Sequence, residues 1–226
     1  IPQDLLKRQV EITGPPVPKK MFISALNSGA DCYMTDFEDS LTPTFDNLIY
    51  GQLNIKDAIS KKIDFIDHES GKEYKLNEKT AVLIIRPRGL HLDEKHVTIN
   101  DKRISATFFD IGLSLFHNSK KLIENGSGPY FYLPKLEHYL ECRLLNDVIS
   151  FCEKKLNLKI GTIKVTVLIE TINAVFQMDE FLWELKDHIV GLNAGRWDYL
   201  FSYQKVFRNA QKVILPDRSK VNMFVP

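Results

Sequence analysis

Short apolar runs alternate with longer amphipathic segments along this chain. Residues 80–85 (TAVLII) and 162–169 (TIKVTVLI) are mostly β-branched and apolar, which is typical of strands that are buried on both faces. Residues 107–124 and 137–156 instead carry apolar side chains at helical spacing. This alternation predicts repeated strand–helix units, whose strands pair in parallel through right-handed crossovers.

The pattern predicts about six such units. We expect strands at residues 10–13, 31–37, 80–85, 130–133, 162–169 and 188–192. We expect helices at residues 19–28, 44–60 with an interruption at Gly51, 107–124, 137–156, 174–187 and 199–208, and the start of a further strand at 213–215. The apolar stripe of the helix at 174–187 consists of Val175, Phe176, Met178, Phe181, Leu182 and Leu185. Residues 63–76 and 97–104 predict two inserted antiparallel hairpins, the second turning at Asn100 and Asp101.

A charged residue follows almost every predicted strand. These residues are Asp36, Glu38 and Asp39 after the second strand, then Arg86 and Arg88, Lys135, Glu170 and Asp198. The carboxyl ends of parallel strands meet at one edge of a barrel, where its chemistry collects. Mg²⁺ prefers oxygen ligands such as carboxylates, and Arg or Lys binds an anionic substrate such as a small carboxylate. Convergence from five strands favours an active site with Mg²⁺, and it favours a (β/α)₈ TIM barrel over a doubly wound sheet.

Structural interpretations of single residues stay open at this point. Glu170 is compatible with a helix cap, and Asp198 with a solvated turn. Arg88 fits either a second substrate arginine or a salt bridge to the acids at 36–39. Lys135 fits either a structural ion pair or a substrate contact, and Trp197 fits a cover over the floor of the site.

The overall composition narrows the class of protein. The chain has 226 residues, of which 44% are hydrophobic and 26% charged, with a net charge of +1. This is typical of a globular domain with a sizeable core, and it argues against nucleic acid as a partner. No apolar run approaches the 18 or so residues of a membrane span. The three cysteines form no CxxC motif, so we expect buried free thiols.

Five sequence blocks carry a resemblance to a known family. They are VEITGPPVPKKMFISALNSGADCYMTDFEDS (10–40), AVLIIRPRGLHLDEKH (81–96), GSGPYFYLPKLE (126–137), TVLIETINAVFQMDE (166–180) and GLNAGRWDYLFSY (191–203). In this order they resemble malate synthase of the shorter, A-type class, over essentially the whole chain. One departure is Ala194, where many relatives carry cysteine. The resemblance implies a TIM barrel acyltransferase of the glyoxylate cycle, which condenses glyoxylate with acetyl-CoA and hydrolyses malyl-CoA to malate and CoA.

The resemblance also implies roles for individual residues. Arg86 matches the catalytic arginine that holds glyoxylate and stabilises the developing enolate, and Glu170 and Asp198 match the Mg²⁺ ligands. Gly195, Arg196 and Trp197 match the loop whose backbone N–H groups contact glyoxylate. Asp36, Glu38 and Asp39 are similar to an acidic turn that lines the metal site.

The length of the chain limits what it is expected to do. An eight-stranded barrel typically needs about 250 residues. We therefore expect residues 1–226 to be a partial barrel of about six of eight units, without the C-terminal domain. In the family the catalytic base is an aspartate further downstream, so we expect this chain alone to be inactive. The compartment stays open between peroxisome or glyoxysome and cytoplasm, and the oligomeric state and any fusion to isocitrate lyase also stay open.

Two other functions remain as alternatives. One is an acyl-CoA lyase of the citrate lyase β-subunit type, which shares a similar arrangement of metal-binding acids. The block at 191–203 and the inserted hairpins argue against it. The other is a non-catalytic truncated barrel that keeps only a binding or structural role.

Overall fold

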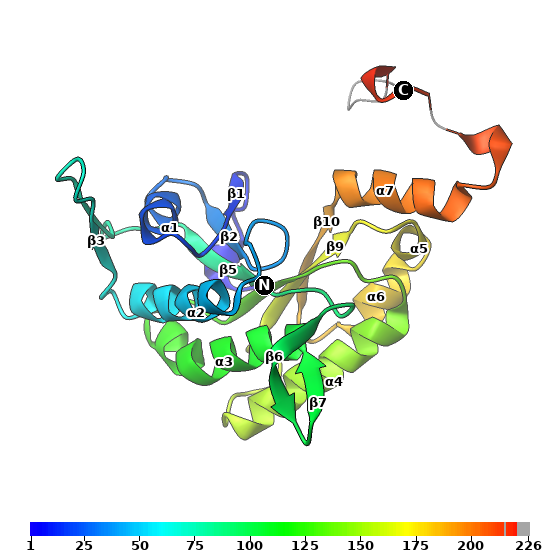
Figure 1. The fold of residues 1–226 in the computed structure, drawn as a ribbon. Coiled ribbons are helices and arrows are strands. Elements are labelled where there is room, and N and C mark those ends of the chain that lie inside the picture. Colours follow the sequence, from blue (N-terminus) through cyan, green and yellow to red (C-terminus); the bar gives the residue numbers. More distant parts are fainter. Residues whose placement is uncertain (215, 221–226) are drawn as a thin grey trace.

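The computed structural model describes residues 1–214 and 216–220, and its centre is a curled sheet of six parallel strands (Figure 1). The strands are β1 (Glu11–Gly14), β2 (Cys32–Asp36), β5 (Val82–Arg86), β8 (Tyr130–Leu133), β9 (Lys164–Ile169) and β10 (Ile189–Ala194). They lie in the order β1-β2-β5-β8-β9-β10, and each neighbouring pair is parallel. The prediction of six parallel strand–helix units is confirmed, and the sheet has the form of a partial barrel.

Each strand of the sheet is followed along the chain by one or two helices. They are α1 (Lys19–Leu26), α2 (Phe45–Ile59), α3 (Ala106–Glu124), α4 (Tyr139–Lys155), α5 (Ile172–Val175), α6 (Met178–Glu184) and α7 (Arg196–Phe207), with 3-10 turns at Gln3–Leu5, Gln211–Val213 and Arg218–Lys220. Figure 1 shows α1 to α4 in an arc along the outer side of the sheet. No helix of the described residues is both long and apolar enough to cross a bilayer.

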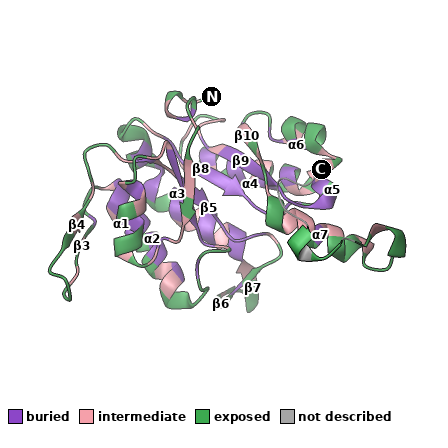
Figure 2. Ribbon diagram, turned by 90° about the horizontal axis from the view of Figure 1, so that it is seen from above, coloured by how far each residue is buried: buried purple, intermediate pink, exposed green. Residues whose placement is uncertain are grey.

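Alternating side chains divide the core into two layers. In β9, Val167 and Ile169 belong to the large cluster beneath the helices, whereas Leu168 belongs to a smaller cluster on the inner face of the sheet. This follows from the two-residue period of a strand. Leu5, from the N-terminal lead-in, packs into the inner cluster. Both faces of the central strands are therefore covered, and Figure 2 shows these strands as largely buried.

Both predicted hairpins are present. The first pairs β3 (Asp64–Ile66) with β4 (Glu73–Lys75), and the second pairs β6 (Asp93–Ile99) with β7 (Lys102–Ser105). Asn100 and Asp101 form the second turn with positive φ angles of 51° and 60°. Asn and Asp accept this conformation more readily than most residues, which is why the sequence predicts the turn.

The predicted interruption of α2 at Gly51 is wrong, because the helix runs through it from Phe45 to Ile59. A Cβ atom at Gly51 would lie 2.8 Å from Phe37 and 2.8 Å from Pro16. The glycine therefore serves close packing of the helix and does not end it.

The single helix predicted at 174–187 is also wrong, because two short helices, α5 and α6, occupy this region. Between them, the Gln177 side chain donates to the carbonyl of Glu137 and accepts from the amide of Tyr139. These bonds tie the break to the start of α4. The predicted apolar stripe is buried only in part, since Phe181 is fully buried whereas Phe176 is 81% exposed.

The last predicted elements differ from the structure in two ways. The helix expected at 199–208 begins earlier, at Arg196, which places Asp198 in its first turn. The strand expected at 213–215 is wrong at Val213, which ends a 3-10 turn, and Leu215 lies outside the described residues. All three cysteines are free, as expected, although Cys152 is only half-buried.

Candidate active site

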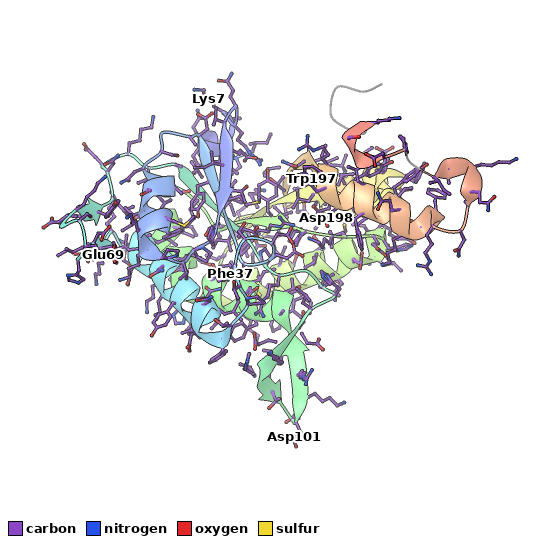
Figure 3. All side chains as sticks on the ribbon, turned by 45° about the horizontal axis from the view of Figure 1, so that its top comes forward. Lys7, Phe37, Glu69, Asp101, Trp197 and Asp198 are labelled. Atoms are coloured by element: carbon purple, nitrogen blue, oxygen red, sulfur yellow. The ribbon has the colours of Figure 1, made fainter. Side chains whose placement is uncertain are left out.

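The predicted site residues gather at the carboxyl ends of the strands. Asp36 and Arg86 are the last residues of β2 and β5, and Glu170 follows β9 directly. Lys135 comes two residues after β8, and Asp198 lies at the start of α7 (Figure 3). Parallel strands end at the same edge of a sheet, so residues far apart in sequence meet here.

Arg86 lies at the centre of this cluster. Its Nη2 atom is 2.6 Å from Glu38 Oε2, 2.8 Å from Asp39 Oδ2 and 3.5 Å from Glu170 Oε1. Its Nη1 atom is 3.7 Å from Asp36 Oδ2. Burial lowers the pKa of Arg86, but the attraction of these carboxylates outweighs burial and raises the pKa. Arg86 is thus held as a cation by acids from two other strand ends.

Asp36 shapes the acidic turn in which Glu38 and Asp39 lie. Its Oδ1 atom accepts from the amides of Glu38 and Asp39, at 2.8 Å and 3.2 Å. Its Oδ2 atom accepts from the amide and the hydroxyl of Ser40, at 3.1 Å and 2.8 Å. An aspartate that bonds to following amides fixes a turn. Asp36 therefore orients the backbone, while Glu38 and Asp39 face the cations.

Lys135 bridges the acidic turn and the later strands. Its amide donates to Glu170 Oε1 at 2.8 Å, and its Nζ atom lies 3.1 Å from Glu38 Oε2 and 3.3 Å from Asp198 Oδ2. Burial lowers the pKa of Lys135, but the charges of Glu38, Asp39 and Glu170 outweigh burial and raise it. Of the two interpretations left open by the sequence, the structure shows the ion pair.

Glu170 is a buried carboxyl group with a raised pKa. Burial raises the pKa of Glu170 to about 7, Arg86 and Lys135 oppose this rise, and Asp198 adds to it. Burial likewise raises the pKa of Glu38, and its Oε1 atom is buried without a hydrogen-bond partner among the described residues. Five carboxylates thus surround two cationic side chains.

This donor set fits a divalent cation chemically. Carboxylate oxygens are the ligands that Mg²⁺ prefers, and one or two of them usually suffice beside water and substrate. The Oε1 atom of Glu38 has no hydrogen-bond partner among the described residues, and the five carboxylates of the cluster outnumber its two cations. Among the described residues, no group of three or more His, Cys, Asp or Glu side chains is arranged to hold a metal. A site on Glu170 and Asp198 would therefore depend on ligands from water and substrate.

The loop before α7 approaches Glu170 closely. A Cβ atom at Gly195 would lie 2.4 Å from Glu170 Cβ, so only glycine fits without a shift. The amide of Gly195 donates to the carbonyl of Ile169 at 2.9 Å and continues the pairing of β10 with β9. The Arg196 guanidinium stacks 4.5 Å from the Trp197 ring centroid. Trp197 is 60% exposed, so it does not form a buried floor.

Arg88 lies apart from the acidic turn. Its guanidinium bonds to Asp110 and Glu94, and all three residues are buried. The predicted salt bridge from Arg88 to the acids at 36–39 is therefore wrong. Sequence reasoning missed Asp110, although an acid between Phe109 and Ile111 within a helix was the available signal. These bonds fasten the segment after Arg86 to α3 and to β6.

Sequence comparison gives close relatives over the whole chain. This chain is 53% identical to malate synthase of Myxococcus xanthus, and the matched region covers 99% of this chain and 41% of that protein. It is 55% identical to the bifunctional glyoxylate cycle protein of Caenorhabditis elegans (100% and 23%) and 53% identical to malate synthase A of Escherichia coli (100% and 42%). The chain thus spans less than half the length of these relatives.

A solved structure and a family model agree with the fold. The Haloferax volcanii malate synthase lead(II) complex superposes with a TM-score of 0.58 at 17% identity, covering 86% of this chain and 51% of that one, which shows a shared fold. The family model described as malate synthase, TIM barrel domain, matches residues 82–226. This match includes Arg86, Lys135, Glu170 and Asp198 of the strand-end cluster. The chain therefore belongs to the malate synthase family.

Proposed function

We propose that this chain supplies the metal and glyoxylate sites of an enzyme that condenses glyoxylate with acetyl-CoA and hydrolyses the product to malate and CoA. The observation that carries the proposal is the convergence of Arg86 with Glu38, Asp39 and Glu170 at the strand ends. A buried, oriented cation can stabilise negative charge that develops during a reaction in a site away from bulk water. The names of the relatives support the same reaction.

In this proposal Glu170 and Asp198 hold Mg²⁺. A bound Mg²⁺ supplies Lewis-acid polarisation of the aldehyde carbonyl of glyoxylate. The excess of carboxylates around Arg86 and Lys135 supports a site for a divalent cation. The H. volcanii structure is a complex with lead(II), which is consistent with a metal site in this fold.

Arg86 contributes electrostatic stabilisation. Its fixed guanidinium offsets the negative charge that develops on the acetyl oxygen as the methyl proton leaves. Glu38 and Asp39 orient Arg86, at 2.6 Å and 2.8 Å, so that no reorganisation is needed during the reaction. The carboxylate that removes the methyl proton is not assigned to a residue of this chain.

The start of α7 orients the anionic end of glyoxylate. A helix N-terminus favours negative charge, because its first amides and the helix dipole point outward. Arg196 and Trp197 open this helix, and Gly195 lets the loop approach Glu170. Because the amide of Gly195 already donates to Ile169, we assign the glyoxylate contacts to the first turn of α7.

Calorimetric titration of the chain with glyoxylate tests this proposal. Binding should require Mg²⁺ and should be lost in Glu170→Ala and in Asp198→Ala. Glu69→Ala is the matched control, since Figure 3 shows Glu69 at the tip of the β3–β4 hairpin, away from Asp198. Equal binding without Mg²⁺, or unchanged binding in both site variants, would contradict the assignment. Tighter binding of other oxo acids would favour an acyl-CoA lyase instead.

We infer the cellular compartment of the protein from the names of its relatives. Relatives from Cucurbita maxima and Candida tropicalis, each 50% identical, are named as glyoxysomal malate synthase. Either a peroxisome-type compartment or the cytoplasm suits the proposed reaction. Imaging of a tagged full-length protein in its own cell would decide between them.

A further inference from the structure

Lys135 has a backbone conformation that few long side chains adopt. Its φ angle is +53°, in the left-handed region, where the Cβ atom crowds the following carbonyl. In this conformation its amide donates to Glu170 Oε1 at 2.8 Å, while its side chain reaches Asp198. One residue thus contacts both of the proposed metal ligands.

The ammonium group of Lys135 lies among the carboxylates of Glu38, Asp39 and Asp198. Its Nζ atom is 3.1 Å from Glu38 Oε2, 3.1 Å from each carboxylate oxygen of Asp39 and 3.3 Å from Asp198 Oδ2. Four oxygens surround a group that has only three hydrogens to donate. General charge compensation, more than directional hydrogen bonding, therefore explains this arrangement.

A divalent cation and the ammonium group compete for Asp198. The Lys135 side chain is only 21% exposed, so water screens its charge incompletely. Two like charges a few ångströms apart repel strongly in such a setting. A cation on Glu170 and Asp198 would have to displace the Nζ atom from Asp198 or accept this repulsion.

We propose that Lys135 is a built-in counter-ion of the metal-free site, which holds Asp198 in place and leaves it when a divalent cation binds. This inference rests on the proposed function, in which Glu170 and Asp198 are the ligands. Lys135 thereby stabilises the site without metal and weakens its affinity for metal. Lys135 is therefore a positioning residue, and removal of its charge should strengthen the binding of a divalent cation.

Two substitutions remove the charge in different ways. Lys135→Met keeps most of the apolar stem, whereas Lys135→Gly relieves the left-handed backbone and keeps the amide that bonds to Glu170. Calorimetric titration with MgCl₂ alone should show at least tenfold tighter binding in both variants. Lys135→Arg, which keeps the charge, should stay near the parent affinity. Lys159→Met removes an exposed lysine and should also change nothing.

Thermal unfolding gives a second readout. In EDTA both charge-removing variants should unfold at a lower temperature than the parent, because the acids lose a counter-ion. Saturating Mg²⁺ should raise their unfolding temperature by more than it raises that of the parent. A structural lysine unrelated to metal would lower the temperature with and without Mg²⁺ alike.

The outcomes separate this inference from the proposed function. Mg²⁺ binding that is unchanged or weaker in both Lys135→Met and Lys135→Gly, with a parent chain that binds Mg²⁺, would overturn the counter-ion role alone. Absence of Mg²⁺ binding in every variant and in the parent would overturn the metal assignment and this inference together. Binding that appears only in the charge-removing variants would support displacement most directly.

Discussion

The buried ion triad of Arg88, Asp110 and Glu94 offers the sharpest test of how the site is supported. The Nε and Nη2 atoms of Arg88 donate to Asp110, at 2.9 Å and 2.8 Å, and Nη1 donates to Glu94 at 2.8 Å. The exposed fractions of the three residues are 4%, 0% and 1%. Arg88→Met would leave the buried carboxylates of Asp110 and Glu94 without their guanidinium partner.

The expected decrease in the free energy of unfolding follows from the loss of Arg88, the only cation of this triad. Removing one partner of a buried pair costs about 3–5 kcal/mol, because the remaining charge is uncompensated. Burial already raises the pKa of Asp110, and Arg88 opposes this rise. Without Arg88, Asp110 would take up a proton, which limits the loss. We therefore expect a decrease of about 3 kcal/mol in the free energy of unfolding at pH 7.

Equilibrium unfolding in urea measures this change. Arg143→Met is the matched control, because Arg143 pairs with Glu184 while its own side chain is 53% exposed. Exposed pairs contribute about 0–1 kcal/mol, so this variant should unfold almost as the parent does. The double variant Arg88→Met with Asp110→Asn should lose less stability than Arg88→Met alone. A loss below about 1 kcal/mol in Arg88→Met would refute the reasoning.

Three further predictions concern other parts of the chain. Gly51→Ala should lower stability by about 1–3 kcal/mol in thermal unfolding, because its Cβ would lie 2.8 Å from Phe37, and a more stable variant would contradict the packing argument. Thr44→Ala should cost about 1 kcal/mol in urea unfolding, because Thr44 Oγ1 caps α2 by accepting from the amide of Asn47, and unchanged stability would exclude that role. Glu170→Gln should gain stability relative to the parent as pH rises from about 4.5 to about 7 without divalent cations, since the folded state holds the Glu170 proton more tightly than the unfolded state and the parent loses that advantage. The difference between the two chains should be flat above about pH 7, and a difference that does not vary with pH would exclude the raised pKa.

The sequence by itself determined the order and type of nearly all elements. Runs such as the one in β9 must be buried on both faces, and the amphipathic segments between runs must be helices. Both signals depend only on residues that are close in sequence, so they can be recognised without knowing which residues pack against them. The sequence also placed Glu170 and Arg86 at strand ends, and parallel pairing then brings strand ends together.

Only the tertiary structure decided where partners far apart in sequence meet. The break at Gln177 depends on hydrogen bonds to the start of α4, and the glycine in α2 depends on contact with Phe37. Neither contact can be recognised from the local spacing of apolar residues in the sequence. Helix propensity is a weak signal that such packing overrides.

The same distinction holds for the charged residues. The sequence shows that Arg88 and Lys135 follow strands. It does not show which of several carboxylates pairs with each of them in the folded chain. The structure pairs Arg88 with Asp110 on α3, 22 residues away, and Lys135 with Glu38, 97 residues away. Charge attraction is not selective at the level of sequence, because any carboxylate satisfies a cation. The geometry at the carboxyl ends of the strands makes the selection.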